Sequence, residues 1–171
     1  MPVDINMWDF KQGTEEEVAA FNRCSNEMRK ERWPDDPPIP LEQTAQGLKH
    51  FPDHLEMTLW TGWAEDFSQI RAYGLIQYSF QDNLHMAQFG ISVLPELRRQ
   101  GLGSEFLSRI VEAAREQNRR LLITDTMDSI PAGEAFMLAI GAEKGLETHT
   151  NQLVIADLDP ELLREWQERA R

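Results

Sequence analysis

The hydrophobic period of this chain changes along its length, and the change limits the folds that the chain can adopt. Three segments between residues 55 and 93 place apolar side chains at every second position, as strands do, and short polar breaks join them as hairpins would. In residues 102–114 the apolar side chains fall instead on one face of a helix. Strands followed by an amphipathic helix indicate a sheet with helices packed on it. We therefore expect an α/β or α+β domain.

The other segments extend this pattern over nearly the whole chain. Thr14 and Glu17 have the spacing of a capping box at a helix start, and the prolines of residues 33–40 separate that helix from the next. The expected elements after a first strand are helices at about 15–31 and 41–50, strands within 55–63, 71–80 and 85–93, a helix from 102, a buried strand at 121–126, a helix at 131–142, a strand at 151–158 and a helix at 160–171. The predicted order is β-α-α-β-β-β-α-β-α-β(-β)-α.

Length and composition indicate a globular domain. The 171 residues are 41% apolar and 27% charged, and no apolar run is long enough to span a bilayer. A net charge of -12 makes general attraction to nucleic acid or anionic membranes unfavourable. The N-terminal residues lack the features of a signal peptide, so a cytoplasmic protein is expected. We predict a single domain at 1–158 and a C-terminal helix at 159–171 that could act as a connector.

Cysteine and histidine form neither a disulfide pattern nor a metal pattern. Cys24 is the single cysteine, so no intramolecular disulfide can form, and no histidine stands beside it in the sequence to make it a nucleophile. We interpret it as a half-buried helix residue. His50 and His54 have the spacing of paired zinc ligands on a helix, but Pro52 between them breaks that helix. No metal site is expected.

The segment RRQGLGS, residues 98–104, lies between a strand and the strongest predicted helix. The first turn of a helix has unpaired N–H groups and the positive end of the helix dipole, and both favour an anion. Gly101 and Gly103 keep Cβ atoms away from this backbone, while Arg98 and Arg99 add positive charge. The segment fits neither a P-loop nor a dinucleotide-binding fingerprint. The alternative is a turn glycine followed by a packing glycine, and the arginines favour a phosphate site.

The stretch VLPELRRQGLG, from Val93 to Gly103, resembles the signature of the GNAT N-acetyltransferase superfamily. Arg98, Gly101 and Gly103 carry the match, and the predicted element order follows that of the family. The resemblance implies a mixed, mostly antiparallel central sheet with helices on both faces. It also implies an enzyme that transfers an acetyl group from acetyl-CoA, without a metal, to an amine of a small-molecule or peptide acceptor. A homodimer is a further expectation, and no nucleic acid or membrane partner is expected.

The resemblance also implies where the cosubstrate binds. The pyrophosphate of acetyl-CoA is expected on the backbone amides from Arg99 to Ser104. The pantetheine arm is expected to pair like an extra strand with the end of the strand at Ile91 to Val93, which would splay from the strand at 121–126. The expected CoA-binding residues are Ile91, Ser92, Val93, Arg98, Arg99, Gln100, Gly101, Leu102, Gly103 and Ser104.

The residues expected to move protons depart from the family pattern. Met137 stands where the family commonly has an acid tyrosine, and Ile130 stands where it often has an asparagine. The usual position of a base falls near Ala87 or Phe89, and neither side chain can accept a proton. The remaining catalytic candidates are His85, Tyr73, Glu56 and Asp125.

Several of these candidates have an alternative interpretation. His85 also suits a solvent-exposed hairpin end, and Asp125 could either orient an amine or cap the following turn. Asp35 and Asp36 lie between the first two helices, where the acceptor-binding loop of the family usually lies. They would suit a cationic amine or a solvated loop equally well.

The aromatic residues of the central strands leave a similar choice. Trp60 and Trp63 could form a wall of an acceptor pocket, although aromatic strand residues more often belong to the core. Tyr73 and Tyr78 lie on opposite faces of one strand. At most one of these tyrosines can therefore face the site.

Three functions are consistent with the sequence. The first is acetyl transfer to an amine. The second is a catalytically silent CoA-binding domain with a regulatory or interaction role, which Met137, Ile130 and Ala87 favour. The final helix agrees with this second function, because it resembles the connector after the first of two fused domains of the family. The third is a protein-interaction module without a ligand, and Gly101 and Gly103 count against it.

Overall fold

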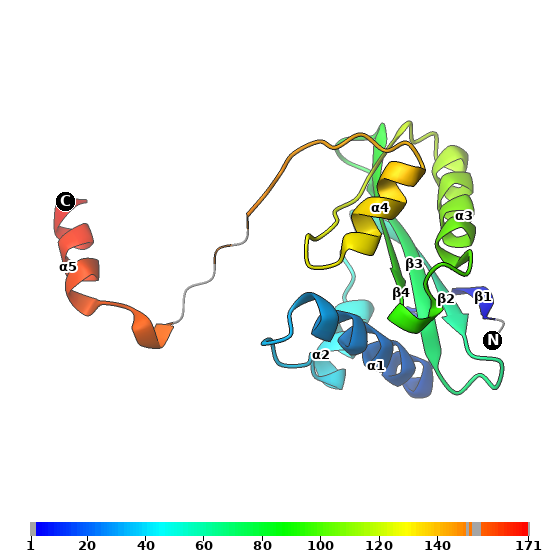
Figure 1. Ribbon diagram of the computed structural model, residues 1–171, viewed down its shortest axis with the longest axis horizontal. Coiled ribbons are helices and arrows are strands. Elements are labelled where there is room, and N and C mark those ends of the chain that lie inside the picture. Colours follow the sequence, from blue (N-terminus) through cyan, green and yellow to red (C-terminus); the bar gives the residue numbers. More distant parts are fainter. Residues whose placement is uncertain (1–2, 150, 152–154, 171) are drawn as a thin grey trace. The chain divides into compact units, whose positions relative to one another are not determined.

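The computed structural model describes residues 3–149, 151 and 155–170 (Figure 1). The chain divides into two compact units, residues 1–140 and residues 141–171. The first unit contains the sheet and four α-helices, and the second contains a 3₁₀ helix at Ile155–Asp157 and helix α5 at Pro160–Arg169. In the described part of the chain, no helix combines the length and the apolarity needed to cross a membrane. A domain that extends to residue 158, followed by a connector helix, stays a prediction.

A five-stranded sheet forms the centre of the first unit, in the order β1-β2-β3-β4-β5. Strands β1 to β4 pair antiparallel with their neighbours, and β5 runs parallel to β4. This mixed, mostly antiparallel sheet confirms the predicted fold class. The strands are β1 Asp4–Trp8, β2 Leu55–Trp63, β3 Ile70–Ser79, β4 Met86–Val93 and β5 Leu121–Ile123.

Helices cover both faces of the sheet. Helix α3 runs along β3 and β4 on one face (Figure 1). Phe106 and Ile110 of this helix are fully buried there with Ile76. Helices α1 and α2 pack against each other and cover the other face, where Cys24 and Leu48 are buried. The apolar stripe predicted for residues 102–114 is therefore the core face of α3. The helices are α1 Glu15–Arg32, α2 Leu41–Lys49, α3 Leu102–Glu116 and α4 Pro131–Ala139.

Helix α3 approaches the sheet closely at Gly74 of β3. A Cβ atom at Gly74 would lie 2.6 Å from Cδ1 of Phe106, which is too close for any real contact. Phe106 has no exposed surface, so its ring has no free space to move into. The missing side chain at Gly74 thus lets α3 lie directly on β3, with its first turn beside the end of β4.

Side chains at the predicted positions begin two of the helices. The Glu17 N–H donates to Thr14 Oγ1 at 3.2 Å, and the Thr14 N–H donates to Glu17 Oε2 at 2.8 Å. This capping box satisfies backbone donors at the start of α1 that have no partner within the helix. At the start of α5, the Glu161 N–H donates to Asp159 Oδ1 at 2.9 Å. Both predicted helix starts are confirmed.

Strand β5 is shorter than the strand predicted at 121–126. It ends at Ile123, and Leu121 is 47% exposed rather than buried. The cause is the end of its pairing with β4 at Gln88, beyond which residues 124–126 leave the sheet. A local apolar run could not predict this, because the pairing depends on a strand distant in the sequence.

The strand predicted at 151–158 is also not seen. Residues 152–154 lie outside the described residues, and Ile155–Asp157 form a 3₁₀ helix. The chain there leads directly into Asp159 and Pro160, which are an N-cap residue and a first-turn proline. The prediction was therefore wrong for residues 155–157.

The buried thiol of Cys24 provides a test of the packing under α1. The side chain is 3% exposed, and burial raises the pKa of the thiol from 9.0 to about 12. Because the unfolded thiol ionises at lower pH, its stabilising contribution is present below the unfolded pKa and is lost as the pH rises toward 12. Compared with a Cys24→Ala variant, the protein is expected to lose about 2 kcal/mol of unfolding free energy between pH 8 and pH 10.5.

Urea denaturation of both proteins across this pH range measures the effect. The same pH dependence in the two proteins would contradict a buried thiol. Other groups that titrate above pH 8 are present in both proteins, so they cancel in the comparison.

Candidate functional site

Strands β4 and β5 separate after three pairs of residues. The pairing runs from Met86 with Leu121 to Gln88 with Ile123, and no later pair joins these strands in the part of the chain that is described. Beyond it, residues 89–93 of β4 and residues 124–127 line a cavity of about 610 Å³. The turn before α3, the first turn of α3, helix α4, the last turns of α1 and two residues of β3 also line it. The predicted separation is thus present, but the chain that leaves β4 after Ile123 is a loop and not a continuing strand.

The turn between β4 and α3 brings the start of α3 to this cavity. After a 3₁₀ helix at Pro95–Leu97, Arg99 and Gly101 adopt positive φ angles of 63° and 88°. Gly101 is the N-cap residue of α3, and no side chain caps the first turn. The N–H groups of that turn are therefore available to an acceptor outside the helix, at the positive end of a 15-residue dipole.

The two glycines of the turn have different structural roles. Gly101 adopts the left-handed conformation that glycine tolerates, and a Cβ atom there would meet nothing within 4 Å. At Gly103, a Cβ atom would lie 3.4 Å from the ring of Phe136 on α4. Gly101 is thus a turn glycine, whereas a Cβ atom at Gly103 would make an ordinary van der Waals contact with α4. The turn requires Gly101, and the free N–H groups are a further property of the same backbone.

Most of the residues predicted to bind CoA line this cavity. They are Ile91, Ser92, Val93, Arg98, Arg99, Gly101, Leu102, Gly103 and Ser104. Gln100 is absent from the lining, and its Nε2 donates to the backbone carbonyl of Glu96 at 3.0 Å. These nine residues surround the cavity, and their role in CoA binding stays a prediction.

Three residues of α1 that line the cavity were not predicted from the sequence. Met28, Glu31 and Arg32 line it from the last turns of that helix. Their spacing of three and four residues places them on one helix face, which is the signal that could have suggested a shared role. The sequence does not show, however, which part of the fold that face meets.

Arg98 forms a paired contact with Glu31 at the edge of the cavity. Its Nη1 donates to Glu31 Oε1 at 2.7 Å, and its Nη2 donates to Glu31 Oε2. Its Nε donates to the backbone carbonyl of Val93 at 3.1 Å. The hydrogen bonds and charge of Arg98 hold the pKa of the Glu31 carboxyl below its usual range. The charge that Arg98 was expected to offer a phosphate is therefore already paired.

The charge of the cavity differs from that of the whole protein. Three arginines and two carboxylates line it, namely Arg32, Arg98, Arg99, Glu31 and Asp125. The chain as a whole carries a net charge of -12. The cavity is thus a small basic region in an acidic protein. The positive end of the α3 dipole also faces it. This combination favours binding of an anion.

The structure brings two of the four catalytic candidates to the cavity. Tyr73 lines it from β3, and Asp125 lines it from the segment after β5. Glu56 is exposed on β2, and His85 is exposed in the turn before β4. Neither of these two belongs to the lining. The assignment of a catalytic role to any of the four stays a prediction.

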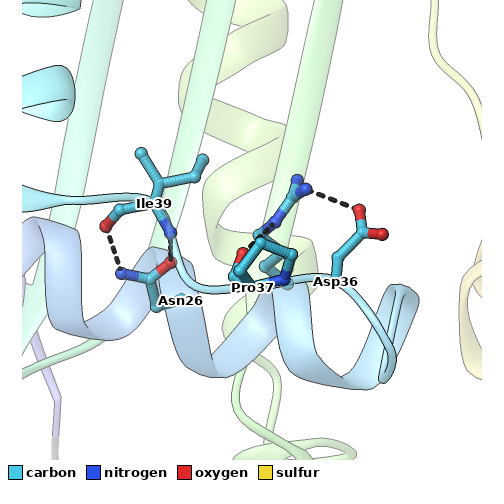
Figure 2. Close-up of polar contacts among 5 residues, drawn as sticks. Asn26, Asp36, Pro37 and Ile39 are labelled. Atoms are coloured by element: carbon cyan, nitrogen blue, oxygen red, sulfur yellow. Dashed lines mark hydrogen bonds and ion pairs between the residues drawn. The ribbon is translucent and has the colours of Figure 1, made fainter.

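Polar contacts hold the loop at 33–40 against α1, as Figure 2 shows. The Asn26 Nδ2 donates to the Ile39 carbonyl at 3.0 Å, and the Ile39 N–H donates to Asn26 Oδ1 at 2.8 Å. The Arg29 Nη2 contacts Asp36 Oδ2 at 2.6 Å. Asp36 is therefore paired within the protein, which leaves less of its charge for a cationic acceptor.

The other candidates on the acceptor side lie apart from the cavity lining. Asp35 is exposed in the loop. Trp60 is buried on the α3 face of the sheet, and Trp63 donates through Nε1 to Thr61 Oγ1 at 3.1 Å. Tyr78 packs on the α3 face, opposite to Tyr73, as the alternation along β3 predicts. None of these residues lines the cavity.

The fold places the end of the β4–β5 pairing and the uncapped start of α3 around one cavity, an arrangement that suits an anionic ligand. Within the described residues, no group of three or more His, Cys, Asp or Glu side chains could hold a metal ion. The chain belongs to the acetyltransferase (GNAT) family, whose pattern matches residues 18–139. The resemblance seen in the sequence is thereby confirmed.

Solved structures of acetyltransferases share this fold. An acetyltransferase from Trypanosoma brucei aligns with a TM-score of 0.63 at 14% identity, over 88% of this chain and 99% of that chain. A ribosomal-protein-alanine N-acetyltransferase from Brucella melitensis biovar Abortus 2308 gives 0.65 at 12% identity, over 90% and 100%. The structure of AAC(6')-Iy in complex with the bisubstrate analogue CoA-S-monomethyl-acetylneamine gives 0.59 at 16% identity, over 90% and 99%. No curated protein matches the sequence.

A carboxylate in the first turn of α3 tests whether that turn binds an anion. Ser104 is exposed and lines the cavity, so Ser104→Glu places a negative charge where the pyrophosphate is expected. The helix dipole favours this charge, so the fold should keep its stability. CoA affinity is expected to fall by at least about tenfold through repulsion between like charges. Isothermal titration calorimetry with CoA measures the change.

Ser108→Glu is the matched control, because Ser108 is exposed on the same helix one turn later and lies outside the cavity lining. It should leave CoA affinity nearly unchanged. Equal affinities of the two variants would contradict an anion site at the start of α3.

Proposed function

We propose that this protein is an N-acetyltransferase that moves an acetyl group from acetyl-CoA to an amine of a small-molecule or peptide acceptor. The observation that carries the proposal is the uncapped first turn of α3, which opens onto the cavity between β4 and β5. Membership of the acetyltransferase (GNAT) family supports it. The cytoplasmic location and the homodimer stay predictions.

The residues present fit coenzyme A. The first-turn N–H groups of α3 have no side-chain acceptor, and Gly101 leaves open space beside them. A pyrophosphate would be held there by several N–H donors, with the charge of Arg99 nearby. The parted edge of β4 at residues 89–93 offers backbone donors and acceptors to the amide groups of a pantetheine arm.

Acetyl transfer also requires groups that hold or move protons. When bound, acetyl-CoA supplies a thioester, whose carbonyl carbon bonds to the amine nitrogen as the C–S bond breaks. A cationic amine loses one proton to water before its nitrogen can attack and a second as the amide forms, while the sulfur gains one. In this proposal, Asp125 attracts and orients a cationic amine, and the hydroxyl of Tyr73 donates the proton to the sulfur. Met137, which also lines the cavity, has no proton to donate.

An amine acceptor agrees with the charge of the protein and with its structural neighbours. The net charge of -12 attracts cations at long range. One neighbour was solved with an acetylneamine analogue, and another aminoglycoside acetyltransferase was solved with sisomicin. We therefore place cationic amines first among the acceptors to be tested.

A catalytically silent CoA-binding domain is the second candidate. Met137 and Ile130 favour it, because both apolar side chains line the cavity where the family pattern has polar groups. Such a domain would have a regulatory role or an interaction role, as one half of a tandem protein would. Both candidates predict CoA binding, and turnover separates them.

Binding and turnover are tested together. Calorimetric titration with acetyl-CoA and CoA is followed by a thiol-release assay with aminoglycosides, polyamines and peptides with free N-termini. An enzyme binds the cosubstrate and releases thiol, whereas a silent domain binds it without release. In an active enzyme, Tyr73→Phe is expected to lower kcat at least about tenfold, because it removes the proposed proton donor.

Tyr78→Phe is the control for this variant, because Tyr78 lies on the opposite face of the same strand and outside the cavity lining. It should leave kcat close to that of the unmodified protein. Absence of CoA binding would reject both the enzyme and the silent domain, and would favour an interaction module.

A further inference from the structure

The ion pair between Arg98 and Glu31 joins two segments that lie 67 residues apart in the sequence. Both side chains are about three-quarters buried, with 25% and 29% of their surfaces exposed. The guanidinium meets the carboxylate through two nitrogens, and its Nε donates to the Val93 carbonyl. This two-point geometry is the strong form of an arginine–carboxylate contact, and it fixes direction as well as distance.

The ion pair lies next to the least favourable backbone conformation of the turn, at Arg99. Arg99, the next residue, has a φ of 63°, a left-handed conformation that costs about 1 kcal/mol for a residue other than glycine. A conformation of this kind persists only where the surroundings hold it. Arg98 is held at its Nε by the end of β4 and at its Nη atoms by α1. The backbone that leads into the first turn of α3 is therefore fixed from two sides.

Helix α1 is a firm anchor for this contact. Its inner face is buried at Cys24 and Met28. Asn26 binds the backbone of the loop that follows, as Figure 2 shows. Arg29 pairs with Asp36 of the same loop. Glu31 thus extends from a helix whose position is set by other contacts, and it can determine the position of Arg98 rather than follow it.

We propose that Glu31 is a positioning residue for the pyrophosphate of coenzyme A: it holds Arg98 so that the backbone N–H groups at 99–104 face the cavity. The inference rests on the proposed function, because it assumes that this turn binds the cosubstrate. It assigns to Arg98 a role within the protein rather than direct contact with phosphate. Glu31 itself contacts neither the phosphate nor the reacting atoms.

The direction in which Glu31→Gln changes CoA affinity distinguishes a positioning role of Glu31 from competition with phosphate for Arg98. If Arg98 were a phosphate ligand that Glu31 merely competes for, Glu31→Gln would release it and CoA would bind more tightly. If Glu31 positions the turn, the same change weakens CoA binding, by roughly tenfold for the loss of a charged two-point contact. Arg98→Lys keeps the positive charge but cannot donate to both carboxylate oxygens in the same geometry, so it should weaken CoA binding as well.

The experiment measures CoA affinity by calorimetry for the unmodified protein, Glu31→Gln, Arg98→Lys and the control Glu27→Gln. Glu27 is an exposed glutamate of the same helix, one turn earlier, and lies outside the cavity lining. The control should bind CoA within about twofold of the unmodified protein, since an exposed charge contributes little. S-acetylpantetheine, which has no pyrophosphate, is tested alongside by ligand-observed NMR. Its binding should be the same in all four proteins.

Amide hydrogen exchange of the free proteins provides a readout that needs no ligand. Glu31→Gln should raise exchange in residues 94–104 and leave the core of α3 unchanged, whereas Glu27→Gln should change neither. Weaker CoA binding with faster exchange in this turn supports the proposal. Unchanged or tighter CoA binding overturns it, as does an equal loss of S-acetylpantetheine binding, which would indicate general damage.

Failure of the proposed function gives a different result. If the unmodified protein binds no CoA, the proposed function is wrong and the role of Glu31 toward the pyrophosphate falls with it. If the unmodified protein binds CoA and Glu31→Gln binds it equally well, only the role of Glu31 is wrong. Thermal unfolding of each variant checks that the fold is retained before these results are compared.

Discussion

The early end of the pairing between β4 and β5 is the constraint on which the rest of the site depends. Backbone N–H and C=O groups inside a protein need partners, so a strand edge that loses its neighbour must find another acceptor or donor. From residue 89 onward β4 faces a cavity on that side. Helix α3 lies close to this opening because Gly74 allows Phe106 to pack directly on β3. The open edge and the free helix start therefore meet in one place.

The turn before α3 shows how one short segment serves the fold and the site together. Gly101 provides the left-handed residue, Gly103 lies beside the ring of Phe136, and Arg98 is paired with Glu31. Each of these features can be explained by folding alone. Folding does not explain why the first N–H groups of α3 are uncapped and lie in a basic region of an acidic protein. These N–H groups are the feature that favours an anionic ligand.

Local sequence patterns predicted the features that depend on neighbouring residues. The strand period at 55–93, the capping box at Thr14 and the apolar stripe of α3 all appear as predicted, because each is a short-range property. The length of β5 and the pairing of Arg98 depend on contacts between distant segments, and no period reveals such contacts. Contacts between distant segments also determine that α1 lines the cavity, so the sequence did not predict it. For the same reason, the sequence could not show that His85 and Glu56 lie outside the lining.

The loop between α1 and α2 has a consequence for recognition. Asn26 satisfies both backbone groups of Ile39, and Arg29 holds Asp36, so the loop has its shape before any ligand arrives. A molecule that meets such a loop loses little conformational entropy of the protein on binding. The conformational entropy of this loop is therefore lost on folding, through contacts within the protein, and not on binding.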